Sequence, residues 1–503
     1  MCLRDDPAPS TERSDRGRIG HGSRCSPCSA IVAAGNLRHR PGDLPLEKSI
    51  AHRPGSAVAA CPGSYADGGM SHSDVIVIGG GLIGMLTAAE LAERGVGVTV
   101  LEKDDVGFEQ SGRSVAAINL PGGRPNPEAS LLRVSADEWS TFEQRWGHGI
   151  DLNDAGWYIV LVDDHDREWL EVERGTWQDT AGYPDAELLD AVDARTRFPQ
   201  FGGTFSAIDV RHGGHVDAMM VMNALRQIAQ RLNIDVRCGE MATGFEIKGD
   251  RVVSVRTTTG SLLSEHVLVA AGLWSPDLCR QLGLRIPMQR VRAPAVETGP
   301  MPPGTIPGFL RGSTFGARQN RNGTIRITGG YRYSAMLHDL SLNDFRDMRI
   351  WAPALWQNRK DVSLRLDPTI LRHELSSRLR SMFARNGNVV VPQRYEPKAR
   401  PSDRYSQLAE LARLVPSLRT SRIQRYFSGV MDLLPDLQPI LGRIPDISNA
   451  FIASGFSGHG YMNGPGACKA MAELITNGTS LIGLEPYRPD RLRGRMKMRE
   501  QIF

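Results

Sequence analysis

Apolar positions begin to follow a regular pattern only after the first seventy residues of the chain. Val75 to Ile78 is a short β-branched run, typical of a buried parallel strand, and residues 82–94 form a helical stretch that ends at Gly95. Residues 96–101 have the pattern of a second buried strand. We therefore expect a strand–helix–strand unit here and an α/β fold for the part of the chain that contains it.

Later stretches predict further strands and helices. Residues 266–284 read as a strand that ends in Ala-Ala-Gly, followed by a tryptophan and a helix. Residues 451–475 read as a strand, a glycine-rich turn and a helix, and residues 214–260 as a helix, a strand and a hairpin. The alternation of strands with helices continues the α/β pattern of the first unit.

Residues 1–69 are rich in Arg, Pro, Gly and Ser and have no strand or helix pattern. Their longest apolar run, AIVAAG, is too short for the hydrophobic region of a secretory signal. We expect this leader to be disordered, and we interpret Met70 as the natural start. The leader is then an artefact of an upstream start or a dispensable tail, while a transit-type peptide is disfavoured by its acidic residues.

Composition narrows the class of protein. The 503 residues suffice for two domains or one large discontinuous fold, and the net charge of +4 gives no reason to expect nucleic-acid binding. No apolar run approaches the roughly 18 residues of a membrane span. Four of the seven cysteines precede Met70, while Cys238, Cys279 and Cys468 lie far apart without metal-ligand spacing. We expect reduced thiols, a cytoplasmic protein and no metal site.

Gly79, Gly81 and Gly84 follow the first strand with the spacing GxGxxG. The first glycine permits a tight turn, the second lets backbone approach a pyrophosphate, and the third lets the helix pack closely on the strand. Glu102 ends the second strand about 20 residues later, where a carboxylate accepts ribose hydroxyls. Together these features predict a dinucleotide site. Glu102 disfavours the 2′-phosphate of NADP but does not separate NAD from FAD.

Three stretches favour FAD over NAD. Residues 107–118, GFEQSGRSVAAI, carry small and hydroxyl side chains and one arginine, which suits a loop around a pyrophosphate or a flavin edge. The strand end AAGLW (270–274) and the glycine-rich turn GFSGHGY (455–461) follow later in the chain. Backbone N–H groups at the start of the helix after that turn can stabilise negative charge on a flavin.

Five motifs, in order between about residues 74 and 485, resemble those of the D-amino-acid oxidase, glycine oxidase and sarcosine oxidase family of FAD-dependent amine oxidoreductases. They are GGLIG with Glu102, SGRSVAAI, VAAGLWS, GFSGHGYMNGP and GVMDLLPDLQPILG, the last resembling the family's GxRPxTPDGxPxIG. The resemblance implies noncovalent FAD, since Cys468 lies at no position that matches a covalent attachment site. It implies FAD contacts from Gly79, Gly81, Leu82, Ile83, Gly84, Glu102, Lys103, Ser111, Gly112, Arg113, Ser114, Ala271, Gly272, Trp274, Gly429, Gly455, Ser457, Gly458, His459, Gly460 and Tyr461.

The resemblance also implies a Rossmann-like FAD-binding domain of the glutathione-reductase type and a discontinuous substrate domain built on a mostly antiparallel sheet. We expect residues 70–120, 205–285 and 428–485 in the first domain, residues 121–204 and 286–427 in the second, and a tail at 486–503.

The implied reaction is oxidation of a C–N bond in a small amine or amino acid. A hydride passes from the carbon beside a neutral amine to flavin N5, the imine hydrolyses, and oxygen or a quinone-type acceptor takes the electrons. Two alternatives stay open: a noncatalytic or electron-transferring flavoprotein subunit of a larger complex, and an NAD(P)H-dependent flavin hydroxylase. The hydroxylase is disfavoured because its late Gly-Asp-Ala motif is absent.

The chain departs from the family at the residue that clamps a substrate carboxylate. Met431 stands where many members have arginine, and methionine cannot make a bidentate pair with a carboxylate. Either another arginine binds the carboxylate, or the substrate presents a different group near Met431. Of the possible substrates we expect a secondary amine or N-substituted amino acid, as in the sarcosine oxidase group. Further substrate-site candidates are Tyr331, Arg332, Tyr333 and His459. In a strand Tyr331 and Tyr333 share one face and Arg332 the other, so only one set can point into the site.

A second departure is an insertion at about residues 336–400, rich in charged and aromatic residues. Residues 371–383 within it have helical apolar spacing, and residues 404–418 after it match the helix that the family has here. We expect the insertion to cap the substrate site, to contact a partner subunit, or to be a plain surface excursion.

Overall fold

The computed structural model describes residues 72–119, 130–162, 186–329, 337–340, 347, 349–352, 356, 363–383, 388–389, 391–397 and 403–493. All of them belong to one compact unit. The expectations for the leader, for the tail beyond residue 493 and for Tyr331, Arg332 and Tyr333 lie outside the described residues.

An eight-stranded sheet is built around the predicted strand–helix–strand unit, in the order β19-β20-β11-β1-β2-β8. Strands β1 (His72–Ile78), β2 (Val98–Glu102), β8 (Asp235–Cys238), β11 (Ser261–Val269) and β20 (Ala450–Ser454) run parallel to one another. Strand β19 (Ile440–Arg443) and the ribbon of β9 (Ala242–Lys248) and β10 (Arg251–Thr257) pair antiparallel. The central strands contain apolar runs, such as Val75–Ile78 in β1 and Val267–Val269 in β11, because both faces of the sheet are covered.

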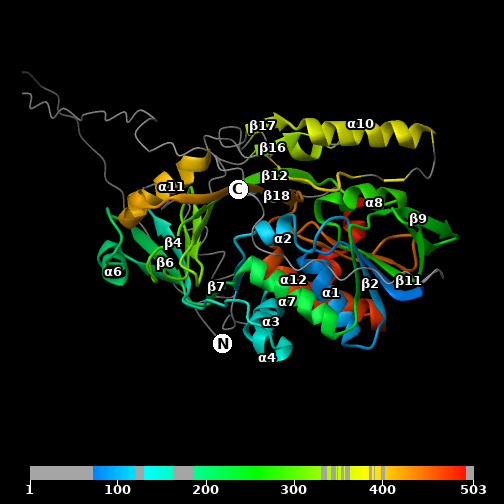
Figure 1. The fold of residues 1–503 in the computed structure, drawn as a ribbon, viewed down its shortest axis with the longest axis horizontal. Coiled ribbons are helices and arrows are strands. Elements are labelled where there is room, and N and C mark those ends of the chain that lie inside the picture. The colour runs from blue at the N-terminus through cyan, green and yellow to red at the C-terminus, as the bar shows by residue number, and fades with distance from the viewer. Residues whose placement is uncertain are drawn as a thin grey trace, which may run out of the picture. The chain divides into compact units, whose positions relative to one another are not determined.

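Helices α1 (Leu82–Ala92), α7 (Ala218–Arg231), α12 (Gly460–Asn477), α3 (Ser130–Ser140) and α4 (Phe142–Trp146) gather on one side of this sheet (Figure 1). They share one core cluster, in which α1 packs on α12 and α12 on α3. The β9–β10 ribbon and α8 (Ser275–Gln281), which follows the turn Gly272–Trp274, belong to the cluster on the other face. A doubly covered parallel sheet is the arrangement that the sequence predicted.

A second sheet has ten strands in the order β17-β16-β12-β15-β14-β13-β4-β6-β5, with β18 paired to β12. Most pairs are antiparallel, and the exceptions are β13 with β4 and β16 with β17. The strands are β4 (Trp157–Leu161), β5 (Glu187–Leu189), β6 (Ser206–Val210), β12 (Gln289–Thr298), β13 (Phe309–Arg311), β14 (Gly316–Gln319), β15 (Ile325–Thr328), β16 (Leu337–Leu340), β17 (Ser363–Leu366) and β18 (Ile423–Leu433). The mostly antiparallel second sheet confirms the predicted fold class.

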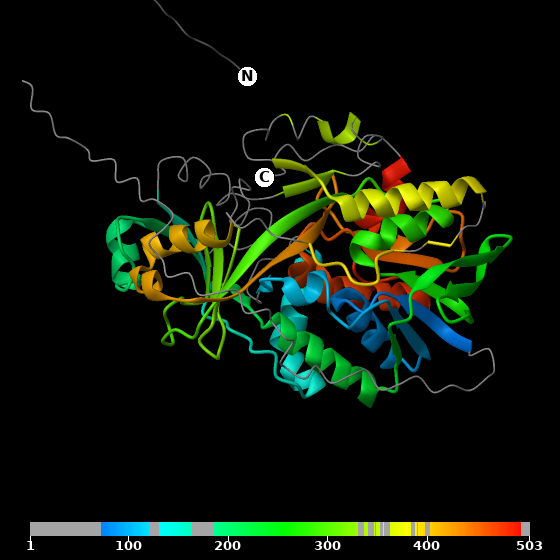
Figure 2. The same ribbon diagram turned by 45° about the horizontal axis from the view of Figure 1, so that its top comes forward.

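Helices α6 (Ala191–Arg197) and α11 (Asp403–Leu414) lie beside the second sheet, and the long strands β12 and β18 extend from it toward the first (Figure 2). Between the sheets lie the short helix α2 (Gln110–Arg113) and the ribbon of β3 (Ala117–Asn119) with β7 (Gly213–His215). The predicted insertion contributes β16, β17 and α10 (Pro368–Phe383). The domain limits inferred from the sequence remain predictions.

The cysteines differ in part from expectation. Cys279 and Cys468 are free and buried, but Cys238, which we grouped with the reduced thiols, is disulfide-bonded. No helix within the described part of the chain has the length and apolar character needed to cross a membrane. Among the same residues no group of His, Cys, Asp and Glu is arranged to hold a metal ion.

Candidate active site

The three fingerprint glycines bring strand β1, helix α1 and strand β11 into close contact. Gly79 has φ +116°, and a Cβ there would collide with the carbonyl oxygen of Ala270. A Cβ on Gly84 would overlap the carbonyl oxygen of Gly79, so only glycine lets the helix approach the strand this closely. Gly81 precedes α1, whose first N–H, on Leu82, donates to Ser111 Oγ at 2.9 Å. The helix N-terminus therefore faces the cavity described below with its partial positive charge.

Glu102 lies at the end of β2 with its carboxylate between two backbone donors. Its Oε2 accepts from Gly80 N–H and its Oε1 from Asp104 N–H, both at 2.8 Å. Burial raises the pKa of Glu102 to about 7, although these two N–H groups and Lys103 act in the opposite direction. The carboxylate is thus held in position, and additional hydroxyl donors would favour its ionised form.

Trp274 and Lys103 converge on Glu109, a residue that the sequence did not single out. The indole N–H of Trp274 donates to Glu109 Oε2 at 2.9 Å, and Lys103 Nζ donates to Glu109 Oε1 at 2.6 Å. Lys103 Nζ also lies 5.6 Å from the centre of the Trp274 ring. These contacts join the loop after β2 to the turn after β11.

The loop that carries α2 links the two sheets. Arg113 donates to the carbonyl oxygen of Ser428 on β18 at 3.1 Å, and its guanidinium stacks 4.9 Å from the Phe108 ring centre. Burial lowers the pKa of Arg113, but the guanidinium remains a cation at neutral pH. Gly112 cannot carry a side chain easily, because a Cβ would lie 2.5 Å from the Gly107 carbonyl oxygen.

The turn before α12 has an unusual backbone. Gly455, Ser457 and Gly458 have φ of +70°, +52° and +85°. Ser457 tolerates this because its hydroxyl accepts the Leu434 N–H at 3.1 Å, which ties the turn to the end of β18. His459 occupies the N-cap position of α12, and the N–H groups of the first helical turn point toward the preceding turn.

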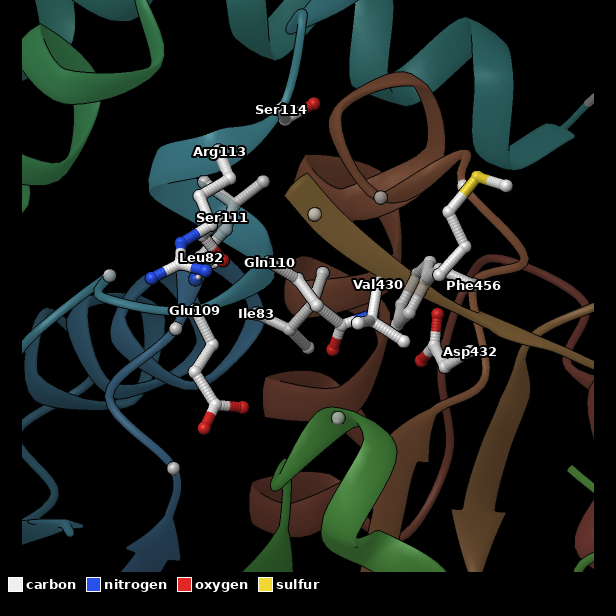
Figure 3. A pocket seen from close by; sticks show the side chains of 18 of the residues that line it. Leu82, Ile83, Glu109, Gln110, Ser111, Arg113, Ser114, Val430, Asp432 and Phe456 are labelled. Carbon is white, nitrogen blue, oxygen red and sulfur yellow. Dashed lines mark hydrogen bonds between the residues drawn. The ribbon is translucent and has the colours of Figure 1, made fainter. Parts of the chain in front are cut away.

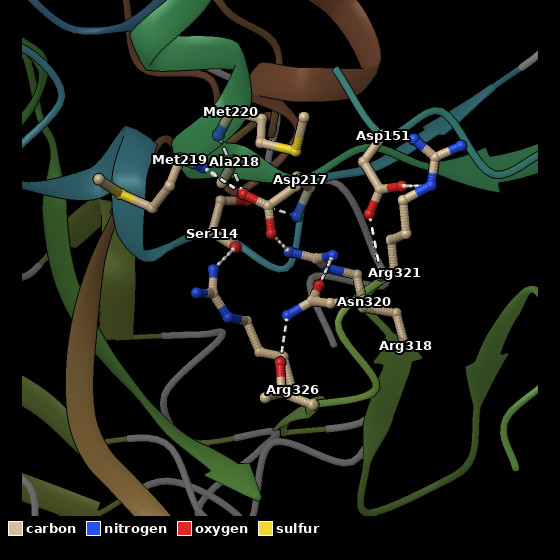
Figure 4. A network of polar contacts seen from close by, with 12 residues as sticks. Ser114, Asp151, Asp217, Ala218, Met219, Met220, Arg318, Asn320, Arg321 and Arg326 are labelled. Carbon is tan, nitrogen blue, oxygen red and sulfur yellow. Dashed lines mark hydrogen bonds and ion pairs between the residues drawn. The ribbon is translucent and has the colours of Figure 1, made fainter. Parts of the chain in front are cut away.

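A polar network contacts the loop that carries α2 (Figure 4). Asp217 caps α7 and accepts from Met219 and Met220 N–H at 2.9 and 3.0 Å, and its other oxygen lies 3.4 Å from Arg318. Arg318 on β14 faces Arg326 on β15, and Arg326 donates to the Ser114 carbonyl oxygen at 2.9 Å. Both arginines are buried, and burial lowers the pKa of Arg318 to about 10.

These elements surround one continuous cavity of about 350 Å³, within the range of ligand-binding sites (Figure 3). Among the predicted residues that line it are Gly79, Gly81, Leu82, Ile83, Glu102, Lys103, Ser111, Arg113, Ser114, Ala271, Gly272, Trp274, Gly429, Met431, Ser457, Gly458, His459, Gly460 and Tyr461. Gly84, Gly112 and Gly455 are not among its lining residues. The structure thus brings together stretches separated by more than 300 residues.

Several lining residues escaped the sequence analysis. Glu109 and Gln110 precede the hydroxyl residues of the loop, and Asp432 and Phe456 flank residues that were singled out. Figure 3 shows Glu109 and Arg113 on one side of the cavity and Asp432 and Phe456 on the other, with Gln110 between them. Gln110 and Asp432 hydrogen-bond to each other, and this pairing of distant residues leaves no signal in a single sequence.

One part of the cavity wall is aromatic and apolar. Trp157 on β4 and Phe309 on β13 meet edge to face with ring centres 5.2 Å apart, and Val115, Ala117 and Met462 pack against their cluster. All five side chains line the cavity. Since Met462 directly follows the 455–461 turn, this apolar wall lies next to that turn.

Arg311 adds a cation to this wall from the same face of β13 as Phe309. Its cross-strand neighbour is Gly316, which in turn pairs with Thr328 on β15. Gly316, which has no side chain, and Thr328 both line the cavity. The sequence analysis did not single out Arg311, because nothing near it marks a motif.

The geometry fits FAD. The N-terminus of α1 and the glycine turn suit a pyrophosphate, Glu102 suits ribose hydroxyls, and the turn before α12 offers backbone N–H groups at the other side of the cavity. Apolar side chains of Leu101, Met241, Ala242 and Leu278 near Glu102 suit an adenine ring.

Comparison with known proteins agrees with this geometry. The profile of the FAD dependent oxidoreductase family, DAO, matches residues 74–474. Glycine oxidase of Pseudomonas aeruginosa is 23% identical over 428 residues, which cover 82% of this chain and 98% of that protein. Sarcosine oxidase subunit beta of Rhizobium meliloti is 26% identical over 438 residues, which cover 84% of this chain and 88% of that protein.

Among solved structures, L-amino acid deaminase from Proteus vulgaris superimposes with a TM-score of 0.73 at 19% sequence identity. The superposition covers 86% of this chain and 99% of the deaminase. At this identity the likeness concerns the fold, and it agrees with the two-sheet architecture described above.

Proposed function

This chain belongs to the DAO family of FAD-dependent oxidoreductases, and from this premise we propose that it oxidises the C–N bond of a small N-substituted amino acid. One observation carries the proposal. Residues of all five motifs line one cavity. The same cavity is lined by the aromatic side chains of Trp157 and Phe309 and by Arg311. A cofactor and a small organic acid can therefore share this space.

FAD, when bound, supplies the two-electron acceptor for the hydride that leaves the substrate carbon. The chain's own residues position it: Gly79 and Gly81 admit the pyrophosphate to the N-terminus of α1, and Glu102 accepts the ribose hydroxyls. The N–H groups that begin α12 face the site where negative charge develops. These roles rest on the family's chemistry together with the cavity-lining positions.

We propose that FAD is held noncovalently. Cys279 and Cys468 are buried, neither lines the cavity, and burial raises the pKa of both thiols. Cys468 Sγ instead donates to the carbonyl oxygen of Ile83. A thiol in this state is a poor nucleophile, which supports a noncovalent site.

Arg311 is the proposed anchor for the substrate carboxylate. Met431 lines the cavity and offers no charge, whereas Arg311 brings a guanidinium to the cavity wall from the same strand as Phe309. Arg311 is half-buried beside Phe309, where partial desolvation strengthens a charge-assisted hydrogen bond. Gly316 and Thr328, on the neighbouring strands, also line the cavity.

The reaction requires few further groups from the protein. A neutral secondary amine loses a hydride from its adjacent carbon, the resulting iminium adds water, and the adduct breaks into a carbonyl compound and a shorter amine. The apolar wall favours the neutral amine over the ammonium, because burial disfavours charge. The electrons leave to oxygen or to a quinone-type acceptor.

The test is a product assay on the FAD-loaded protein. Sarcosine, N-methylated larger amino acids, glycine and D-amino acids are supplied with oxygen or a soluble quinone, and aldehyde, keto acid and ammonia are measured. We expect N-substituted amino acids to be turned over with carbonyl product equal to acceptor reduced. If no amine in the panel gives product while FAD is bound, the noncatalytic subunit becomes the better account.

A further inference from the structure

The insertion forms part of the cavity wall at the nucleotide side. Val389 and Val391 are buried and line the cavity, in one apolar cluster with Leu101, Met241 and Leu278. Leu101 directly precedes Glu102, the proposed ribose ligand. The inserted residues therefore lie at the adenosine end of the cavity. From the sequence we expected the insertion to cap the substrate site, to contact a partner subunit or to be a surface excursion.

Residues 391–397 also bind the loop that follows β2. Lys103 Nζ donates to the carbonyl oxygen of Gln393 at 2.8 Å, and the Arg394 guanidinium stacks 4.0 Å from the centre of the Phe108 ring. Glu396 lies 3.8 Å from Arg113. At the other side, Val389 N–H donates to the Thr243 carbonyl oxygen at 2.6 Å. The segment thus contacts both walls of the adenosine end.

Helix α10 fixes this segment to the body through buried ion pairs. Asp367, just before the helix, pairs with Arg292 of β12 and accepts the Tyr395 hydroxyl at 3.3 Å. Glu374 lies 3.4 Å from Arg290 on the same strand. All four charged side chains are buried, so their geometry is more restricted than that of a surface pair.

Trp274 is enclosed by the same inserted residues. The rings of His373 and Tyr395 meet its indole edge to face at 5.5 and 5.7 Å, and Arg290 lies 5.6 Å from its centre. Trp274 itself lines the cavity and binds Glu109. The insertion and the predicted cofactor residue therefore form one packed unit.

We propose that residues 388–389 and 391–397, anchored by α10, cover the adenosine half of FAD and set how tightly the dinucleotide is retained. This rests on the proposed FAD site but on no property of the amine substrate. The cover supplies apolar contacts for the adenine and excludes water from the Glu102 carboxylate, which strengthens its hydrogen bonds to the ribose.

The first test replaces both cavity valines. In the double variant Val389→Ala, Val391→Ala, release of FAD from the holoenzyme is followed by the rise in flavin fluorescence. We expect the dissociation constants of FAD and of ADP to rise about tenfold through loss of buried methyl groups. Val192→Ala is the matched control, because it makes the same change at a valine that is 72% exposed. Equal constants in wild type, double variant and control overturn the proposal.

A second measurement needs no variant and therefore does not depend on the double variant folding. Hydrogen exchange of backbone amides is compared in the wild-type protein with FAD, after FAD removal, and with ADP added back. We expect the peptide that contains residues 388–397 to exchange more slowly with FAD or ADP, and riboflavin, which has no adenosine, to leave it unchanged. Exchange that is equal in all states overturns the cover, whatever the outcome of the amine assays.

Discussion

Asp432 Oδ2 accepts a hydrogen bond of 3.0 Å from the backbone N–H of Gly455, which joins the end of β18 to the turn before α12. In the sequence Asp432 directly follows Met431, the position at which the chain departs from the family. In the structure the buried carboxylate of Asp432 faces Gln110 and the strained turn. Asp432 thus helps to support the turn before α12, which lines the proposed flavin site.

This burial predicts a particular pH dependence of stability. Burial raises the pKa of Asp432 to about 6, above its ordinary value of 3.8. Because the folded protein binds this proton more tightly than the unfolded chain, the Asp432 contribution to stability falls as pH rises from about 4 to about 6. Urea unfolding of Asp432→Asn should lack that fall. Asp154→Asn, at an exposed site, should keep it, and identical profiles for all three proteins would contradict the assignment.

The ionisation of Glu102 should make the protein bind FAD more tightly as pH rises. Its raised pKa of about 7 means that the carboxylate, the better acceptor for ribose hydroxyls, is lost as pH falls from 8 to 6. The FAD dissociation constant should therefore increase over this range. Glu102→Gln should bind FAD about tenfold more weakly at pH 8, with a flat profile. Titration by flavin fluorescence measures both, and Glu246→Gln, at an exposed carboxylate, serves as the control.

Gly84 offers a steric test of the fingerprint. In Gly84→Ala the new methyl group overlaps the Gly79 carbonyl, so helix α1 must move away from the strand. We expect a loss of about 3 kcal/mol in the free energy of unfolding and little bound FAD after purification. Gly483→Ala introduces the same methyl group where no atom lies within 4 Å. Comparable flavin content and unfolding midpoints in the two variants would show that the close approach is unimportant.

The Asp217–Arg318 pair should be structurally important because both groups are withdrawn from water. Asp217→Ala removes the cap of α7 and leaves Arg318 buried without its counter-charge, which costs about 3–5 kcal/mol of unfolding free energy. Glu410→Ala removes the partner of Arg413, which is 76% exposed, and should cost less than about 1 kcal/mol. Denaturant unfolding of the two variants compares them directly, and equal losses would refute the buried role.

If Arg311 anchors the substrate carboxylate, its replacement should weaken substrate binding much more than it slows the chemical step. Arg311→Met should raise KM for a carboxylate-bearing amine about 100-fold, equivalent to about 3 kcal/mol, while kcat changes much less. An amine without a carboxylate should be affected little. Arg321→Met, which makes the same change at an exposed arginine, should leave both constants unchanged. A large fall in kcat at constant KM would place Arg311 elsewhere in the mechanism.

The sequence predicts those structural features that depend on residues close together in the chain. Gly79, Gly81 and Gly84 encode their own turn and helix contact, so the strand–helix–strand unit and a dinucleotide site could be predicted directly. Asp432 and Gln110 interact across more than 300 residues, and Val389 packs beside Leu101, which lies more than 280 residues earlier in the chain. Such contacts are set by tertiary packing, which leaves no periodic signal in one sequence.

Anaerobic reduction of the bound flavin tests the central claim most directly. The holoenzyme is mixed with a saturating N-substituted amino acid, in the absence of oxygen and of NAD(P)H, and its visible absorbance is followed in a stopped-flow instrument. The account predicts that the flavin band bleaches in a single turnover and that one carbonyl product forms per FAD. A flavin band that stays unchanged with every amine, but bleaches when NADH or NADPH is added, would contradict it.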